Sequence, residues 1–376
     1  MIKVTLFLKR IRDLFFGNIK PVSIKGQFNK EQLIFRSDKF CMPQHLDIFN
    51  TKHANFGEYE IEMPAFYVRS YSNAWCFTNR EEILNANKEV IVEYTSQKKN
   101  PLIGASKVLF ARKKRKITGV AAHLSLSGLE NNYYHFLTEC LARFYLLEQS
   151  NFKPDFYIIS NHLRFQKEIL NLLGIRADRI IPTNSNLLLE VETLIVPDLI
   201  NNWTAINYRG VDHYQKQWQP SWTINLYRDN IALIKSKNST GRKIYVSRDK
   251  AAHRKFVNHA AVNQLFFETG FEAYYLEEMS IAQQIELFSS AAFVAGIHGA
   301  GFSNLYFANP GIKFLEIYSA HYLDASYRVL STAAGINYMY LIGETPSVEN
   351  IHPLTEDVYI DIGKLKDALT KLLADK

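Results

Sequence analysis

The segment Gly296-Ile297-His298-Gly299-Ala300-Gly301-Phe302-Ser303-Asn304 follows a run of small apolar residues, 292–295, and precedes a helix expected over 302–308. Glycines at such a strand-to-helix turn let backbone N–H groups approach an anion, and the helix N-terminus adds partial positive charge. The segment matches neither the Walker A nor the G-x-G-x-x-G motif. Taken alone it indicates either an anion-binding turn or a tight turn in which His298 bonds only the backbone.

Around this turn, apolar runs and helical patterns alternate over most of the second half of the chain. We expect strands over residues 243–247, 273–276, 292–295, 314–318 and 338–342. We expect helices over residues 257–269, 280–289, 302–308, 323–334 and 362–372, the last capped by Asp361. This alternation predicts an open α/β domain with a parallel sheet.

The first half of the chain is regular only after about residue 131. We expect helices over 133–148 and up to Gly174, strands over 156–159 and 187–196, and a helix over 224–236. The tryptophan-rich stretch 197–223 fits either a loop-rich connection or part of an acceptor surface, and the polar turn 237–241 is interpreted as an interdomain linker.

The resulting fold class is α/β, with two Rossmann-like domains facing a cleft and an irregular N-terminal region. The expected domains are 1–100, irregular and joined to the first domain; 101–236, the acceptor-side domain; 241–350, the ligand-binding domain; and 351–376, a C-terminal helix packing back on the first domain.

Composition excludes several classes of protein. The chain has 376 residues, 47% hydrophobic and 22% charged, which is a globular composition. It has no uncharged apolar stretch of roughly 18 residues, so no membrane-spanning helix is expected. Its three cysteines show no C-x-x-C spacing, which argues against a disulfide framework or a zinc cluster and favours a reducing cytosol. The N-terminus does not have the pattern of a usual signal peptide.

The chain carries Lys+Arg 44 against Asp+Glu 37, a net charge of +7, with basic groups concentrated in 1–16 and 112–116. Each basic stretch indicates either contact with an anionic membrane or a solvated charged face. The pI of about 9.0 would permit nucleic-acid binding, but no known binding motif accompanies the charge, so nucleic acid is not an expected partner.

Two arginines stand close to the expected carboxyl ends of strands. Ser247 and Arg248 end the first strand of the second domain, and Arg254 lies in the loop after it. Because ligands of open α/β sheets bind outside these strand ends, we expect both arginines to face the same crevice as the His298 turn. Guanidinium groups suit phosphate oxygens, although exposed loop arginines with surface partners are the alternative. Glu316 either accepts from ribose or sugar hydroxyls or pairs with an arginine.

In the first domain, His135, Glu139 and Arg143 recur every four residues on the helix expected over 133–148. A histidine or a carboxylate there fits a general base acting on an acceptor hydroxyl. The alternative is a helix-surface network in which Glu139 orients His135 and Arg143.

Taken together, segments 132–139, 247–258 and 296–316 resemble glycosyltransferase family 61, which includes bacterial capsular polysaccharide transferases and eukaryotic xylosyl- and N-acetylglucosaminyltransferases. The resemblance spans roughly 128–342. One departure is that Asn258-His259 stands where the family usually has Asn-Glu.

The resemblance implies a GT-B arrangement and an inverting transferase that takes its sugar from a nucleotide-sugar, with a UDP-sugar favoured. No metal or other cofactor is expected. The implied donor-binding residues are Ser247, Arg248, Arg254, His298, Gly299, Ala300, Gly301, Asn304 and Glu316. His135 is the expected catalytic base, with Glu139 orienting or replacing it.

The expected acceptor is a glycan or lipid-linked glycan in bacterial capsule or other surface polysaccharide biosynthesis. We read the sequons at Asn202 and Asn238 as chance matches and expect a cytoplasmic enzyme with peripheral contact at the inner membrane. The alternatives are a nucleotide-sugar epimerase or hydrolase on the same fold, and a non-catalytic nucleotide-sugar-binding protein.

Overall fold

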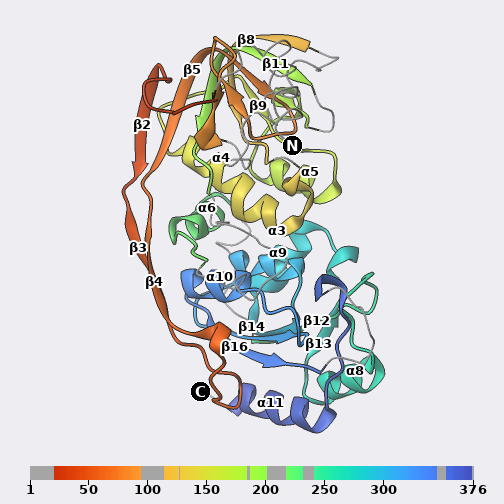
Figure 1. Cartoon of the computed structure of the whole chain (residues 1–376). Coiled ribbons are helices and arrows are strands. Elements are labelled where there is room, and N and C mark those ends of the chain that lie inside the picture. Colours follow the sequence, from red (N-terminus) through yellow and green to blue (C-terminus); the bar gives the residue numbers. More distant parts are fainter. Residues whose placement is uncertain are drawn as a thin grey trace, which may run out of the picture. The chain divides into compact units, whose positions relative to one another are not determined.

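The computed structural model describes residues 21–94, 114–126, 128–183, 187–200, 217–231, 241–344 and 353–374. The chain forms two compact units (Figure 1). Unit 1 comprises residues 1–37 and 64–201, and unit 2 comprises residues 38–63 and 202–376. The basic stretch 1–16, both sequons and the expected linker up to residue 240 lie outside the described residues.

Unit 1 contains a nine-stranded mixed sheet in the order β1-β7-β6-β5-β11-β8-β9-β10, with β2 paired to β5. The strands are β1 (Pro21–Val22), β2 (Lys30–Phe35), β5 (Phe66–Phe77), β6 (Ile83–Leu84), β7 (Val90–Ile91), β8 (Lys114–His123), β9 (Phe156–Ile158), β10 (Ile180–Ile181) and β11 (Leu188–Pro197). The predicted strands β9 and β11 are confirmed, and β11, β8, β9 and β10 run parallel to one another.

The expectation of an irregular N-terminal region is wrong for most of its described residues. β5 is a strand of 12 residues that pairs antiparallel with β11. Most of its side chains are buried on both faces of the sheet, so the sequence lacks the alternation of apolar and polar residues by which a half-exposed strand is recognised. The first unit is therefore only in part a parallel α/β domain.

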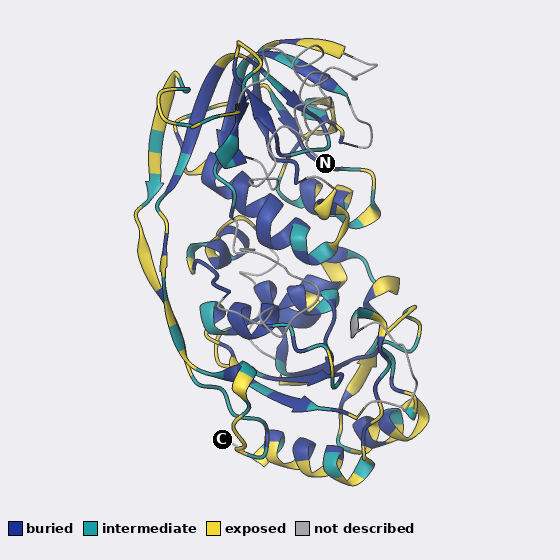
Figure 2. Ribbon diagram, in the orientation of Figure 1, coloured by how far each residue is buried: buried dark blue, intermediate teal, exposed yellow. Residues whose placement is uncertain are grey.

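The helix expected over 133–148 is confirmed, but it is interrupted. It consists of α3 (Tyr133–His135), a π-helical segment η4 (Phe136–Cys140) and α4 (Leu141–Glu148). Figure 2 shows that α4 is buried over most of its surface. The other helices of unit 1 are η2 (Val92–Tyr94), η3 (Leu129–Asn131), α5 (Arg164–Leu172) and η5 (Ala177–Arg179).

Unit 2 contains a five-stranded parallel sheet in the order β13-β12-β14-β15-β16. The strands are β12 (Arg242–Val246), β13 (Glu272–Tyr274), β14 (Ala291–Ile297), β15 (Lys313–Tyr318) and β16 (Asn337–Ile342). Numbered along the chain, this is the doubly wound order 2-1-3-4-5, whose switch point lies between β12 and β14. The predicted parallel sheet of the second half is confirmed.

Unit 2 contains the expected helices, with shifted ends, and two short ones that were not expected. They are α6 (Trp222–Asn230), α8 (His259–Glu268), η7 (Leu276–Glu278), α9 (Ile281–Ser289), η8 (Ala300–Phe307), α10 (Ser326–Ala334), η9 (Pro353–Thr355) and α11 (Ile362–Ala374), of which η7 and η9 were not expected. The expected boundary at 236 is corrected, because α6 belongs to unit 2 and not to the first domain. The segment expected as a helix over 302–308 is instead the 3-10 helix η8, which begins two residues earlier.

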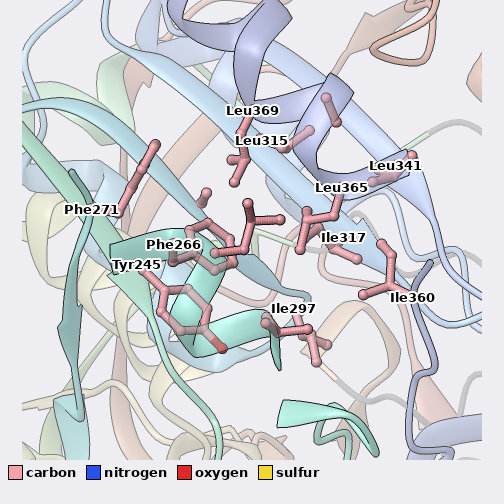
Figure 3. Close-up of a cluster of buried hydrophobic side chains, with 14 of the residues drawn as sticks. Tyr245, Phe266, Phe271, Ile297, Leu315, Ile317, Leu341, Ile360, Leu365 and Leu369 are labelled. Atoms are coloured by element: carbon pink, nitrogen blue, oxygen red, sulfur yellow. The ribbon is translucent and has the colours of Figure 1, made fainter. Parts of the chain in front are cut away.

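The C-terminal helix α11 packs on unit 2, which corrects the expectation that it lies on the first domain. Its buried residues Leu365 and Leu369 contact Leu315 and Leu341 of the parallel sheet in one apolar cluster (Figure 3). Asp361 caps the helix as predicted, because its Oδ1 accepts from the backbone N–H of Lys364 at 2.7 Å.

A segment of the expected N-terminal region also belongs to unit 2. In what we call the 38–63 hairpin, β3 (Asp38–Met42) and β4 (Tyr59–Met63) pair antiparallel, and η1 (Ala54–Phe56) lies between them. The backbone N–H of Ile48 donates to the carbonyl of Tyr340 in β16 at 2.9 Å. The hairpin is therefore fastened to the edge of the parallel sheet.

Within the described residues, no helix is both long enough and apolar enough to cross a membrane.

Candidate functional site

The strand ends of β12 and β14 come together at the switch point of the parallel sheet. Val246 of β12 is paired with Gly296 of β14, which has φ +156°. A Cβ at Gly296 would lie 2.6 Å from the carbonyl oxygen of Val246, so only glycine allows this approach. The turn after β14 is thereby held beside the loop after β12.

Arg248 follows β12 and lies directly against the glycine turn. Its Nε donates to the carbonyl of Arg254 at 3.1 Å and its Nη2 to that of His253 at 3.0 Å. A Cβ at Gly299 would overlap Nη1 of Arg248. The structure therefore brings Arg248 and the turn together, as the sequence predicts.

Arg254 has φ +56°, a left-handed backbone conformation that is uncommon for residues other than glycine. Its Nε is buried and has no hydrogen-bond partner among the described residues. Its guanidinium lies 5.5 Å from the ring centroid of Tyr322. A strained arginine with an unpaired buried donor is typical of a ligand site rather than of a stabilising surface contact.

The two arginines affect one another. Burial, and after it the charge of Arg254, lowers the pKa of Arg248 to about 10, so Arg248 remains cationic at neutral pH. Holding two like charges close together costs free energy that an anion between them would offset. We call Arg248, Arg254 and the turn at residues 298–301 the candidate anion site.

His298, the first residue of that turn, is held by a buried carboxyl group. Its Nδ1 lies 2.6 Å from Oε1 of Glu316, and its ring stacks on Tyr318 with centroids 5.5 Å apart. Burial, opposed by the charge of Asp324 and assisted by the charges of Arg254 and Arg248, lowers the pKa of His298 to about 3. The imidazole is therefore neutral at physiological pH, and fixed in orientation.

Glu316 has a different position from the one expected. Its side chain is fully buried, and its Oε2 accepts from the hydroxyls of Tyr318 at 2.6 Å and Tyr338 at 2.9 Å. Burial raises the pKa of Glu316 to about 8. Both oxygens contact protein groups, so Glu316 orients His298 instead of facing a sugar hydroxyl, and its pairing with an arginine is not observed.

Asn304 is buried inside unit 2 and ties η8 to its neighbours. Its Nδ2 donates to Oε1 of Gln284 at 2.8 Å and to the carbonyl of Gly301 at 2.9 Å. A Cβ at Gly301 would lie 2.7 Å from Cδ1 of Leu276. Both residues thus shape the turn, and Ala300, directly before Gly301, opens η8.

Ser247 is also buried and bonds its own loop. Its Oγ accepts from the N–H of Asp249 at 3.4 Å, and its N–H donates to the carbonyl of Tyr274 at 3.0 Å.

Asn258 and His259 stand at the position where this sequence departs from the family pattern. The side chain of Asn258 donates to the carbonyl of Ile360 at 2.8 Å, whereas the side chain of His259 is 58% exposed.

The second predicted cluster lies in unit 1, at the start of the interrupted helix. The side chain of Asn132 accepts from the N–H of Tyr134 at 2.9 Å and caps α3. Nδ1 of His135 lies 2.6 Å from Oε1 of Glu139, with side chains 13% and 7% exposed. The expected pairing of these two residues is therefore present.

Arg143 does not join that pair, which corrects the expected shared face. The N–H of Leu141 bonds the carbonyl of Phe136, five residues back, so the π-helical segment adds a residue to the turn and rotates the rest of the helix. Arg143 is consequently buried, and it donates to the carbonyls of Ser125 at 2.9 Å and Pro197 at 3.2 Å. Its role there is to satisfy main-chain carbonyls.

Three tyrosines around His298 were not expected from the sequence. Tyr318, Tyr322 and Tyr327 all contact the imidazole ring, with centroid distances between 5.1 and 5.5 Å. Glu316 and Tyr318 are two residues apart on a strand and share one face of it, so their proximity was readable from the sequence. The other two come from the loop after β15 and from α10, and their contacts depend on the tertiary fold.

The structure thus places His135 and Glu139 in unit 1 and the other predicted site residues in unit 2.

The family model described as Glycosyltransferase 61 matches residues 133–315. No curated protein matches the chain. The family match runs from the helix that carries His135 to the strand that leads to Glu316, and it includes Arg248, Arg254 and the glycine turn. Over these residues the chain matches the glycosyltransferase 61 family, and glycosyltransferases in general transfer a sugar from a nucleotide-sugar donor to a glycan acceptor.

Proposed function

We propose that this chain is an inverting glycosyltransferase that moves a sugar from a nucleoside-diphosphate sugar, with a UDP-sugar favoured, to a hydroxyl of a glycan or lipid-linked glycan. The proposal includes a role in bacterial capsule or other surface polysaccharide biosynthesis. The observation that carries it is the pair of arginines held together against the Gly299 turn at the switch point of the sheet. A diphosphate supplies the anionic oxygens that this pair lacks.

In this proposal unit 2 holds the donor. The guanidinium groups of Arg248 and Arg254 stabilise the negative charge that develops on the leaving diphosphate, and the backbone N–H groups of the turn assist them. His298, neutral and oriented by Glu316, supplies a hydrogen bond of fixed direction. Because this charge stabilisation comes from protein groups, the proposal includes no metal and no other cofactor.

Unit 1 supplies the base in this proposal. Inversion requires a direct attack of the acceptor hydroxyl on the anomeric carbon, and a group that takes the hydroxyl proton. A histidine whose Nδ1 is bonded to a carboxylate accepts a proton at Nε2, as in other His-carboxylate pairs. His135, held by Glu139 at 2.6 Å, has this arrangement. The two units then take the donor and acceptor roles of a GT-B enzyme.

The first test is a thermal-shift screen of the purified chain against UDP, GDP, CDP, CMP and their sugars. A ligand that binds only the folded state raises the unfolding temperature by mass action. A shift with one nucleoside diphosphate supports the proposal and identifies the donor class. If the folded protein shows no shift with any of them at millimolar concentration, the proposed donor site is wrong.

The second test uses the His135→Ala variant. We expect it to lose transfer while keeping the affinity for the nucleotide, because His135 lies in the other unit. A variant that loses nucleotide binding as well would contradict the assignment of His135 as base.

Other parts of the proposal need their own tests. NMR of the product's anomeric configuration tests inversion, and an assay with excess EDTA tests independence from metal. Turnover of the donor without acceptor would indicate an epimerase or hydrolase instead.

The proposed location is the cytoplasm, with peripheral contact at the inner membrane. Within the basic stretch 112–116, Lys114, Arg115 and Lys116 are exposed at the start of β8. Sedimentation with anionic liposomes tests this contact, and a wild-type protein that stays in the supernatant would count against it.

A further inference from the structure

A second buried carboxyl group in unit 2 holds a histidine that is exposed. Nδ1 of His321 lies 2.9 Å from Oε1 of Glu356, and the backbone N–H of His321 donates to Oε2 of the same group at 3.3 Å. The side chain of Glu356 is 1% exposed, whereas that of His321 is 65% exposed. Both carboxyl oxygens therefore fix the position of one solvent-facing imidazole.

This arrangement differs from an ordinary surface ion pair. An exposed pair keeps both partners hydrated and contributes little to stability. Glu356 has instead lost its hydration, which costs free energy, while the histidine that it holds remains in solvent. A carboxyl group buried behind an exposed histidine is the usual way to orient an imidazole toward a ligand.

The position of His321 adds to this argument. The loop 319–325 follows the carboxyl end of β15, which is adjacent to β14 in the sheet. The next residue, Tyr322, lies with its ring centroid 5.5 Å from the guanidinium carbon of Arg254 and 5.2 Å from the His298 ring. His321 therefore neighbours a residue that contacts two members of the candidate anion site.

The segment that carries Glu356 also fastens the arginine loop. Oδ1 of Asp357 accepts from the N–H of Lys255 at 2.9 Å, and the N–H of Val358 donates to the carbonyl of Lys255 at 2.8 Å. Lys255 directly follows Arg254. One short segment thus sets the positions of both the Arg254 loop and the His321 loop.

We propose that His321 is a further ligand of the donor's diphosphate, with its imidazole donating from Nε2 to a phosphate oxygen, and that Glu356 is its positioning residue. The inference rests on the proposed function and adds one side chain to the contacts proposed for Arg248, Arg254 and His298. Both residues lie outside 133–315, so the family match does not assign them.

The experiment is isothermal titration of the whole chain with UDP, GDP, CDP, inorganic pyrophosphate and the three free nucleosides. For His321→Ala we expect roughly tenfold weaker binding of the nucleoside diphosphate and of pyrophosphate, because one charged hydrogen bond is lost. Binding of the nucleoside should not change. The difference from wild type should shrink in high salt, since the lost contact is ionic.

Two further variants separate ligand binding from folding. His162→Ala removes an exposed histidine from unit 1 and should bind every probe as the wild type does. Glu356→Gln keeps an oxygen near His321 but removes the negative charge, and it should weaken diphosphate binding less than His321→Ala. Combining it with His321→Ala should weaken binding no further than His321→Ala alone.

The outcomes distinguish the two proposals. If wild type binds a nucleoside diphosphate and folded His321→Ala binds it equally well, the role of His321 is wrong and the proposed function stands. If wild type binds neither a nucleoside diphosphate nor pyrophosphate, the proposed function fails and this inference fails with it. A loss that is equal for nucleoside and diphosphate would show a structural role only, and would also overturn the inference.

Discussion

The ring of Phe56 lies flat on the ring of Tyr340, with centroids 3.7 Å apart and planes inclined by 8°. Phe56 is 2% exposed and comes from the 38–63 hairpin, whereas Tyr340 belongs to β16. We expect Phe56→Ala to lower the free energy of unfolding of unit 2 by about 3 to 5 kcal/mol, through lost burial and the cavity that remains. Urea denaturation measures this loss. The control is Phe267→Ala, since Phe267 is 75% exposed, and an equal effect of both variants would contradict the prediction.

Arg328 of α10 fastens the same hairpin by hydrogen bonds. Its Nε donates to Nδ1 of His45 at 3.0 Å, its Nη1 to the carbonyl of Asn55 at 3.0 Å, and its Nη2 to the carbonyls of Pro43 and Gly57. Arg328 is only 1% exposed, and Arg328→Met removes all of these hydrogen bonds at once, so we expect it to lower the free energy of unfolding by roughly 3 kcal/mol or more.

Arg328→Lys should recover only part of that loss, because one ammonium group cannot reach all the acceptors that surround the planar guanidinium group of Arg328. Arg176→Met is the control, since the side chain of Arg176 is 75% exposed. Chemical denaturation measures the stability of the variants. If Arg328→Met is as stable as Arg176→Met, the hairpin does not depend on Arg328.

Glu316 makes the stability of unit 2 dependent on pH. Burial raises the pKa of its carboxyl group from 4.5 to about 8, so between these values the folded protein keeps a proton that the unfolded chain releases. The stabilisation from this group is therefore complete below about pH 4.5 and is lost as the pH rises through about 8.

Glu316→Gln should flatten this part of the pH profile, because glutamine does not titrate. The measurement is the free energy of unfolding between about pH 5 and pH 8.5, with the exposed Glu268→Gln as control. If Glu316→Gln keeps the wild-type slope, the carboxyl group is ionised in the folded protein and the prediction is wrong.

Gly299 leaves room for the guanidinium of Arg248, and a methyl group there would overlap its Nη1. The backbone of Gly299 is extended, with φ −179°, so alanine is compatible with its conformation and the protein should still fold. We expect Gly299→Ala to weaken nucleoside diphosphate binding at least tenfold, roughly the loss of one charged hydrogen bond.

Calorimetry with UDP, GDP and CDP measures that change. Gly57→Ala is the matched control, because a Cβ at Gly57 meets its nearest atom at an ordinary 3.7 Å. Equal affinities for the two variants would show that Arg248 does not need its present position to bind a diphosphate.

The sequence predicts the parallel sheet of unit 2 well because local signals agree there. Gly270 and Gly335 end their helices in left-handed conformations, with φ +80° and +69°, where other residues would be strained. The apolar runs that follow these helix ends match buried parallel strands. The meeting of Arg248 with the glycine turn follows from general sheet topology, and it was therefore predictable.

Other features depend on contacts between segments far apart in the sequence. Nothing local to 38–63 indicates that Phe56 packs on Tyr340, nearly 300 residues later, or that Pro43 accepts from Arg328. The π-helical segment at 136–140 moves Arg143 away from His135, and it contains no glycine or proline from which an interruption of the helix could be predicted. The role of Glu316 could not be predicted from the sequence, since a carboxylate near a strand end fits a contact with a ligand as well as a buried hydrogen bond to another side chain.

The assignment of residues 38–63 to unit 2 has a consequence for how this gene can be divided. The polypeptide passes from one unit to the other three times, after residues 37, 63 and 201, so unit 2 corresponds to two separate coding segments. A chimera that exchanged only codons 202–376 with a homologous gene would pair a foreign β16 with the native Phe56, and a foreign α10 with the native hairpin groups that accept from Arg328. Recombination that preserves a folded unit 2 must therefore carry the short early segment along with the long late one.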